Sequence, residues 1–256
     1  MNSPVSWIEK YEVKPGRWVY IPTEESKLLG KKIIKHVNKH WQAPPYFFHL
    51  KKGGHVQALK SHLESHYFAS LDIADFFGSM SRTRVTRSLK EYLGYEDARA
   101  IAKASTIPHR RKDEHSHALP YGFSQSPLLA SLCLDKSTLG KCIKECYESP
   151  EAIITVYMDD IVVSSSNKTH IQKWLNKVKF AAKKSNLKLN EAKELPISAK
   201  VEVFNIELST EALAITDKRF SLFYDVYKNS TSEPQRHGIG GYVWTVNPQQ
   251  AKQLDL

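Results

Sequence analysis

Hydrophobic positions recur at helical spacing in several stretches of the chain. The first stretch follows Thr23, a residue type that caps helices, and has an apolar side chain at every fourth position from 29 to 41. The same periodicity predicts helices over 56–66, 85–93, 126–147 and 168–182. The ends of three of these helices carry matching signals. Gly94 can end the helix at 85–93, Ser126-Pro127 can begin the helix at 126–147, and Asn167 can cap the helix at 168–182.

Runs rich in β-branched residues separate these helices and predict strands at 67–73, 152–156, 161–163, 187–189 and 201–208. An aromatic segment at 46–50 is a further short strand candidate. A polar linker is expected from about residue 229, ahead of the glycine-rich segment 238–246. Helices and strands in this order predict an α+β fold with an antiparallel sheet.

Two adjacent acids, Asp159 and Asp160, lie between the strands of the predicted hairpin. Bare neighbouring carboxylates repel each other, and magnesium suits such a site because it binds carboxylate oxygens, water and phosphates. Asp72 follows another predicted strand and would add a third carboxylate if the strands lie together. Three carboxylates can hold two metals for phosphoryl transfer. The alternatives are a solvated turn for the pair and a strand-end cap for Asp72.

The charge balance points to a polyanionic partner. The chain has 256 residues, with 37 Lys+Arg against 27 Asp+Glu, which gives a formal charge of +10. Nucleic acid is the first candidate, and an anionic membrane surface is the competing one. No apolar stretch approaches the roughly 18 residues that a span needs, and residues 1–7 lack the pattern of a signal peptide. We therefore expect a cytoplasmic protein that does not bind membranes.

The cysteines support the same compartment. There are three, Cys133, Cys142 and Cys146, and their odd number and spacing fit neither a disulfide framework nor a common zinc pattern. We expect reduced thiols in the core.

Several segments in order give the chain a family resemblance. It resembles a bacterial reverse transcriptase of the retron, abortive-infection or defence-associated (unknown-group) kind over roughly residues 15–250. The segments that carry the resemblance are 72–80 (DIADFFGSM), 119–127 (LPYGFSQSP), 157–160 (YMDD), 189–193 (LNEAK), 203–206 (VFNI), the upstream Ala58 and His62, and the downstream 241–248.

The resemblance implies a right-hand fold, with palm and fingers, an antiparallel palm sheet and a short helical thumb. The implied parts are fingers at 1–66, palm at 67–82, a fingers/palm insertion at 83–118, palm with the catalytic hairpin and primer grip at 119–208, and a short thumb at 209–256. About 50 residues after the primer grip are too few for a ribonuclease H, integrase or maturase domain.

The resemblance also assigns the catalytic groups. Asp72, Asp159 and Asp160, with Ile73, would hold two Mg²⁺ ions, for which Mn²⁺ could substitute. Lys193 would lie near the departing pyrophosphate as a general acid. A solvated surface lysine is the alternative for Lys193.

Nucleotide contacts are implied on both sides of the acids. Phe77 would exclude a 2′-hydroxyl and so select deoxynucleotides, while Phe76 fills the core. Gly122 would allow close backbone approach to substrate, with a simple turn glycine as the alternative. Tyr121 departs from the family's usual glutamine, and Gln125 is a candidate to replace part of that contact.

Further contacts complete the implied site. Met158 would border the nucleotide, and the triphosphate would meet charged donors from the fingers. These donors are Arg17, Lys51 and Lys52. The primer grip would comprise Phe204, Asn205 and Ile206.

The resulting hypothesis is an RNA-directed DNA polymerase that extends a primer hydroxyl with dNTPs. By resemblance its partners are a non-coding RNA template, nascent DNA, and an effector protein or further copies of itself, and its role is antiphage defence. Two alternatives stay open. One is a palm polymerase with non-standard templating, which makes RNA or untemplated DNA tails. The other is a non-catalytic RNA-binding scaffold.

Overall fold

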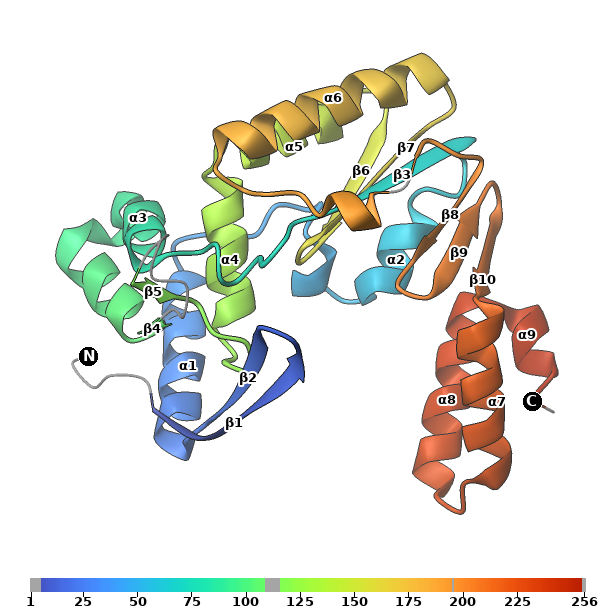
Figure 1. Ribbon diagram of the computed structural model, residues 1–256, viewed down its shortest axis with the longest axis horizontal. Helices are drawn as coiled ribbons and strands as arrows, with labels where there is room; N and C mark the ends of the chain where they lie inside the picture. The colour runs from blue at the N-terminus through green and yellow to red at the C-terminus, as the bar shows by residue number, and fades with distance from the viewer. Residues whose placement is uncertain (1–5, 109–115, 195, 255–256) are drawn as a thin grey trace.

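The computed structural model describes residues 6–108, 116–194 and 196–254. At its centre is an antiparallel sheet with the strand order β3-β7-β6, formed by β3 (Tyr67–Asp72), β7 (Asp160–Ser165) and β6 (Ile153–Tyr157). Helices α5 (Thr138–Glu148) and α6 (Lys168–Lys184) cover one side of this sheet, and α2 (Gly54–Lys60) packs on the other (Figure 1). The predicted hairpin and its neighbouring strand are confirmed.

The N-terminal half surrounds one end of this sheet. A two-stranded ribbon, β1 (Trp7–Lys14) and β2 (Arg17–Pro22), leads into α1 (Glu24–Val37). Thr23 caps α1 as predicted, because its hydroxyl accepts a hydrogen bond from the Ser26 amide at 3.2 Å. The remaining elements here are η1 (Phe48–Leu50), α3 (Arg82–Lys103), β4 (Ile107–Pro108), β5 (His117–Ala118) and α4 (Ser126–Asp135).

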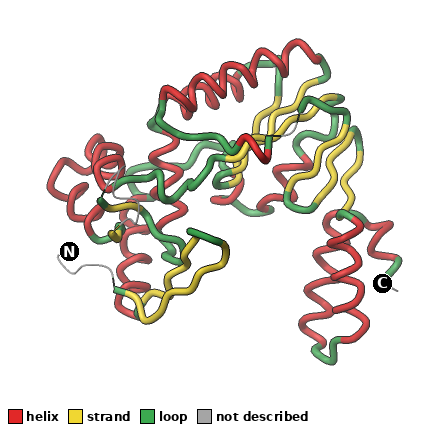
Figure 2. The backbone as a smooth tube through the Cα atoms, viewed as in Figure 1, coloured by secondary structure: helices red, strands yellow, loops and turns green. Residues whose placement is uncertain are grey.

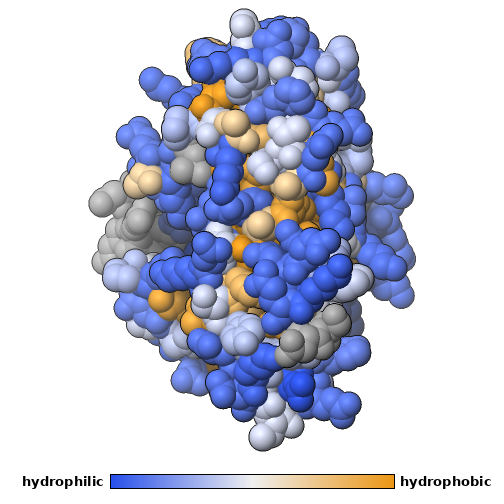
Figure 3. Space-filling model, turned by 90° about the vertical axis from the view of Figure 1, so that its right-hand side faces the viewer, coloured by the Kyte–Doolittle hydropathy of each residue, from blue (hydrophilic) through white to orange (hydrophobic). Residues whose placement is uncertain are grey.

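The C-terminal part forms an arm that projects from the sheet region (Figures 1 and 2). A second antiparallel sheet, in the order β10-β9-β8, contains β8 (Lys200–Val203), β9 (Ile206–Ser209) and β10 (Ala212–Ile215). Helices α7 (Asp217–Asn229) and α8 (Glu233–Val246) pack together beyond it, followed by α9 (Pro248–Lys252). Figure 3 shows the molecule from the side that lies at the right of Figure 1. This surface is mostly hydrophilic, with apolar residues gathered in a band down its middle.

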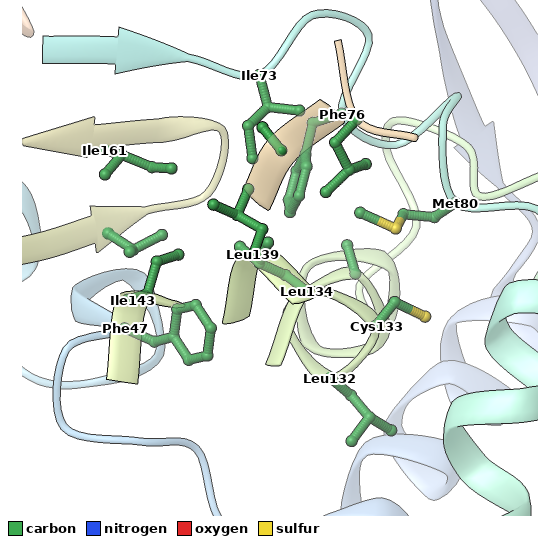
Figure 4. Packing of buried hydrophobic residues seen from close by; sticks show 14 of the residues in the cluster. Phe47, Ile73, Phe76, Met80, Leu132, Cys133, Leu134, Leu139, Ile143 and Ile161 are labelled. Carbon is green, nitrogen blue, oxygen red and sulfur yellow. The ribbon is translucent and has the colours of Figure 1, made fainter. Parts of the chain in front are cut away.

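Two hydrophobic clusters hold these parts together. The larger joins the sheet to α4 and α5, and Figure 4 shows Phe47, Ile73, Phe76 and Met80 converging on it. The smaller cluster packs the C-terminal arm against β3 and α2, through residues that include Phe68. The three cysteines are buried and free, as predicted. Among the described residues, no helix is both long and apolar enough to cross a membrane.

Two predicted helices differ from the structure for local reasons. The single helix expected over 126–147 is two helices, because the Ser137 hydroxyl caps α5 by accepting from the Gly140 amide at 3.1 Å. A Cβ on Gly140 would lie 2.2 Å from the Leu134 carbonyl oxygen, so the two helices meet at a crossing that only glycine allows. Helix α2 ends at Lys60 rather than near 66.

Four further expectations are corrected. Residues 46–50 are not a strand, since Phe47 makes only an isolated bridge to Val156 before η1. The strand expected over 201–208 is a hairpin, because Phe204 and Asn205 both have left-handed backbones, with φ of 60° and 58°. The linker expected near 229 is brief, because Pro234 lies in the first turn of α8, where proline is well tolerated. Gly94 (φ 74°) kinks α3 instead of ending it.

Candidate active site

The ends of two strands bring the three aspartates together. Asp72, the last residue of β3, is the cross-strand partner of Asp160, the first residue of β7. Partners in such a ladder have Cα atoms only about 4.5–5.5 Å apart. The Ile73 amide then donates to the Asp159 carbonyl at 2.8 Å, which extends the pairing to the hairpin turn. The structure therefore assembles the acids from segments almost 90 residues apart, as the sequence analysis expected.

The turn of the hairpin is held by a histidine that the sequence analysis missed. Met158 has a left-handed backbone (φ 56°), and its amide donates to His49 Nδ1 at 3.0 Å. That bond makes Nδ1 the acceptor, so the neutral ring carries its proton on Nε2, which lies 2.7 Å from Ser131 Oγ. Burial lowers the pKa of His49 to about 4, which keeps this tautomer neutral. Position 49 follows an aromatic run, and no motif marks it.

The acids make a strongly negative, half-enclosed site. Burial, followed by the charges of Asp159 and Asp72, raises the pKa of Asp160 to about 7. The pKa of Asp159 is also raised, first by burial and then by Asp72. Lys193 Nζ lies 2.6 Å from Asp72 Oδ2, and this hydrogen bond raises the pKa of the lysine. In the described parts of the chain, no group of three or more His, Cys, Asp or Glu side chains is arranged to hold a metal ion.

Lys193 reaches Asp72 because its loop is attached to the end of β3. The Asn190 amide donates to the Asp72 carbonyl, and the Ala74 amide donates to the Lys188 carbonyl, both at 2.8 Å. A short 3-10 turn, η2 (Glu191–Lys193), then presents the lysine side chain, which is 56% exposed. Lys193 is therefore paired with a catalytic candidate, and it is not an isolated surface lysine.

A cavity of about 600 Å³ opens beside Asp159. Five residues that the sequence analysis assigned to the nucleotide line it: Arg17, Phe77, Tyr121, Gly122 and Met158. Two further cations, Lys27 and Lys31, line it from α1 and were missed. Their four-residue spacing places them on one face of the helix, which is the signal that could have identified them.

Aromatic side chains form one wall of this cavity. Phe77 is 6% exposed, and its ring packs edge-on against Tyr121 at 4.7 Å between centroids. The Arg17 guanidinium lies 4.3 Å from the centre of the Tyr121 ring, a cation–π contact that fixes Arg17 at the cavity. Burial raises the pKa of Tyr121 to about 12, so its hydroxyl stays protonated. Phe76 is fully in the core, as expected.

Gly122 is tightly packed for a different reason from the one expected. A Cβ there would lie 2.0 Å from the Tyr20 carbonyl oxygen, and φ is 98°. The Tyr20 amide also donates to the Tyr121 carbonyl at 3.0 Å. The close approach is thus between Gly122 and strand β2, and it holds the ribbon against the cavity.

The structure does not bring three other assigned residues to the cavity. Gln125 is fully buried, with its Oε1 2.5 Å from where a Cβ on Gly30 would stand. Lys51 donates to the Pro45 carbonyl and lies over the Phe48 ring, 3.6 Å from its centre. Lys52 is exposed and does not line the cavity. Sequence position alone did not reveal where these side chains point.

The three residues assigned to the primer grip lie in two different environments. Ile206 is fully buried in the smaller core cluster, whereas Phe204 and Asn205 form the turn between β8 and β9. The Phe204 ring packs 5.2 Å from Tyr157 and 5.4 Å from His55. His55 Nε2 in turn lies 3.1 Å from the Tyr242 hydroxyl of α8. These aromatic contacts connect the β6–β7 hairpin to the C-terminal helices.

The family model of the reverse transcriptase (RNA-dependent DNA polymerase) matches residues 8–204, most of the chain. The chain belongs to the reverse transcriptase family. It therefore carries a reverse transcriptase domain over those residues. The matched range contains all three aspartates and the whole cavity lining.

Solved structures share the fold of this chain. Telomerase from Candida albicans in complex with a fragment of telomeric RNA superimposes with a TM-score of 0.55 at 7% identity, covering 90% of this chain and 47% of that one. The foamy viral protease-reverse transcriptase in complex with an RNA/DNA hybrid gives 0.51 at 17% identity, covering 94% and 27%. The chain spans less than half the length of each. No curated protein matches it. The fold is thus the palm-and-fingers fold of reverse transcriptases.

Proposed function

We propose that this protein is an RNA-directed DNA polymerase that extends a primer hydroxyl with dNTPs. The observation that carries the proposal is the cross-strand pairing of Asp72 with Asp160 beside a cavity lined by Asp159 and by the cations Arg17, Lys27 and Lys31. Such a cavity suits a nucleoside triphosphate, whose phosphates need positive charge throughout transfer.

We propose that the three aspartates hold two divalent cations, Mg²⁺ by preference and Mn²⁺ as a substitute. The donors fit in chemical type, because three carboxylates lie at one end of the sheet and carboxylate oxygens are ligands that Mg²⁺ prefers, although the described side chains are not arranged as a closed metal site. Burial, and then the charges of Asp159 and Asp72, raise the pKa of Asp160, and a bound cation would offset that repulsion. Such ions supply charge stabilisation to the reacting phosphate oxygens. The Ile73 backbone is the fourth candidate ligand. Lys193 would hold a proton at Nζ for the leaving pyrophosphate.

The aromatic wall gives the proposed sugar selection a physical basis. Phe77 is held rigidly by Tyr121 and the core, so it cannot turn aside for a 2′-hydroxyl. Selection would then act by steric exclusion of ribonucleotides.

We further propose the palm, fingers and thumb boundaries given by the sequence analysis, although residues 1–5, 109–115, 195 and 255–256 of those segments lie outside the described residues. The retron-like or defence-associated type, a dedicated non-coding RNA, an effector protein or self-association, antiphage defence and a cytoplasmic location are also proposals. The excess of basic residues supports the RNA partner.

One observation favours a second candidate. Tyr121 stands beside Phe77 where the family usually has glutamine, so the contact with the incoming nucleotide differs. A polymerase with non-standard templating, which makes RNA or untemplated DNA, would suit such a change. A non-catalytic RNA-binding scaffold is the remaining alternative.

One set of incubations separates these functions. Purified protein is given an RNA template with an annealed DNA primer, and dNTP incorporation is compared with rNTP incorporation, with and without template. The proposal predicts template-dependent dNTP incorporation, which the double variant Asp159→Asn/Asp160→Asn abolishes without loss of RNA binding. Incorporation without template, or of rNTPs alone, would favour the second candidate. No incorporation by the wild type would favour the scaffold.

A further inference from the structure

Helix α6 lies on the outer side of the palm sheet, away from the cavity. In Figure 1 it runs along the top of the molecule with α5, whereas α1, α2 and the C-terminal arm project from the opposite side. Its inner residues, among them Ile171, Trp174 and Val178, are buried against the core. Its outer residues form what we call the α6 face: Lys168, Gln172, Lys173, Asn176, Lys177, Phe180, Lys183 and Lys184.

The charge of this helix has a single sign. Its 17 residues include six lysines and no acid. Two of the lysines are neutralised from outside the helix, Lys173 by Glu151 and Lys179 by Glu194. Lys168, Lys177, Lys183 and Lys184 have no carboxylate within 4.0 Å among the described residues. On neighbouring α5, by contrast, Lys144 pairs with Glu148 at 3.8 Å.

Such an arrangement works against the helix itself. Like charges four residues apart destabilise a helix, and in the two such pairs, Lys173/Lys177 and Lys179/Lys183, a glutamate from outside the helix neutralises only one member of each. An ordinary solvated face would mix both signs, as α5 does. A helix face that carries only positive charge favours an anionic ligand, because the negative charge of the ligand offsets the repulsion between the lysines.

A large aromatic side chain interrupts the lysines. Phe180 is 63% exposed, and Lys184 Nζ lies 5.1 Å from the centre of its ring. It is the one large hydrophobic residue exposed on α6 within the described structure. Exposed aromatic rings interleaved with cations suit nucleic acids, since the rings can stack on unpaired bases while the cations meet phosphates.

We propose that the α6 face binds RNA through its phosphate backbone, as a second RNA-binding surface on the back of the palm. Lys168 and Lys184 are about 24 Å apart along the helix axis, which is enough to follow several nucleotides. Choosing RNA as the anion rests on the proposed function. An anionic membrane would need a broader apolar strip than a single phenylalanine.

The test compares two triple variants that remove the same charge. The α6 variant, Lys177→Gln/Lys183→Gln/Lys184→Gln, removes three lysines from the α6 face. The control variant, Lys90→Gln/Lys103→Gln/Lys252→Gln, removes three exposed lysines from α3 and α9. Fluorescence anisotropy of a labelled RNA hairpin with a single-stranded loop is measured over a range of salt concentrations. The α6 variant is expected to bind the RNA about 10- to 100-fold more weakly. The slope of the logarithm of its binding constant against the logarithm of salt concentration is expected to be smaller in magnitude by about 2–3.

Equal losses in both variants would overturn the proposal, since net charge alone would then govern binding. The variant Phe180→Ala is expected to weaken binding to the hairpin about threefold or more without a change of salt slope, because stacking carries no charge. Circular dichroism checks that all variants keep their helices. The α6 variant should unfold at the same or a higher denaturant concentration.

A second readout keeps this inference separate from the proposed polymerase activity. Extension of a short primer on a short RNA template should be unchanged in the α6 variant, because the α6 face lies away from the cavity. If the wild type extends no primer but the α6 variant still loses hairpin binding, the proposed function fails and the surface stands. Binding of the wild type to anionic vesicles but not to the hairpin would overturn the inference.

Discussion

The two ends of the central sheet bury polar groups in different ways. At one end, Asp72 and Asp160 are cross-strand partners, Lys193 is hydrogen-bonded to Asp72, and the positive charges of Lys193 and Arg17 offset the repulsion between the acids in part. At the other end, His62 is fully buried, with its ring nitrogens 2.7 Å from Ser164 Oγ and 2.8 Å from Thr155 Oγ1. Both ends share strand β7, which pairs with β3 at the acid end and carries Ser164 at the histidine end, where Thr155 comes from β6. The acid end keeps unresolved repulsion, whereas the histidine end satisfies each ring nitrogen with a hydroxyl.

This difference indicates what each end is for. A buried group with every hydrogen bond made contributes to stability and specificity of the fold. Crowded carboxylates whose pKa values are raised destabilise the fold, and such groups gather at functional sites. Changes at the acid end should therefore affect chemistry first, and changes at the histidine end should affect folding first.

The largest expected effect is at the acid end. Asp72→Asn should reduce dNTP incorporation by at least about 1,000-fold, because it removes a carboxylate that would hold the divalent cations at the reacting phosphates. Primer extension with saturating dNTPs measures the loss. Asp75→Asn is the matched control from the segment directly after β3 and should keep near-normal activity. Similar losses in both variants would contradict the special role of the strand-end acid.

At the histidine end, His62→Ala should destabilise the protein by about 2–4 kcal/mol, since it leaves a cavity and removes the ring partner of the Thr155 and Ser164 hydroxyls, of which Ser164 keeps only its bond to Ser65. Urea unfolding followed by circular dichroism gives this free energy. Activity per folded molecule should be retained at low temperature. A variant of unchanged stability would refute the structural role of the network.

The histidine end should also make stability depend on pH. Burial lowers the pKa of His62 in the folded protein to about 3, whereas the unfolded chain has an ordinary histidine. The unfolded state binds more protons between those values, so stability falls as pH falls below about 6.5. At pH 5 this residue alone should cost about 2 kcal/mol relative to pH 7. Urea unfolding at both pH values should show a smaller difference in His62→Gln.

The smallest expected effect is a change of specificity beside the acid end. Phe77→Ala should increase rNTP incorporation relative to dNTP incorporation about tenfold, since it opens the wall against the sugar. Steady-state kinetics with each nucleotide measures the ratio. Phe76→Leu, a change in the core, is the control and should leave the ratio unaltered. An unchanged ratio in Phe77→Ala would locate the sugar selection elsewhere.

Local sequence signals predicted much of this structure. Thr23 and Asn167 cap helices as expected, because capping depends on side chains within three residues. The hairpin carrying Asp159 and Asp160 also followed from β-branched runs on either side. The ribbon β1–β2 was missed, since its strands mix charged and apolar residues without regular alternation.

The direction of individual side chains was less predictable. Gln125 and Lys51 are sequence neighbours of plausible site positions, yet one faces α1 and the other folds back on Pro45. Lys27 and Lys31 reach the cavity only because α1 packs beside β2 and the 121–124 segment. Such placements depend on contacts between segments far apart in the chain, which local patterns do not contain.

The most direct test of the central claim is to sequence the product that the purified wild-type protein makes. The protein is incubated with an RNA template of defined, non-repetitive sequence, an annealed DNA primer, dNTPs and Mg²⁺. We predict DNA complementary to the template, joined to the primer, and none with Asp159→Asn/Asp160→Asn. Products unrelated to the template, or products that survive in that variant, would contradict a templated polymerase built on these aspartates.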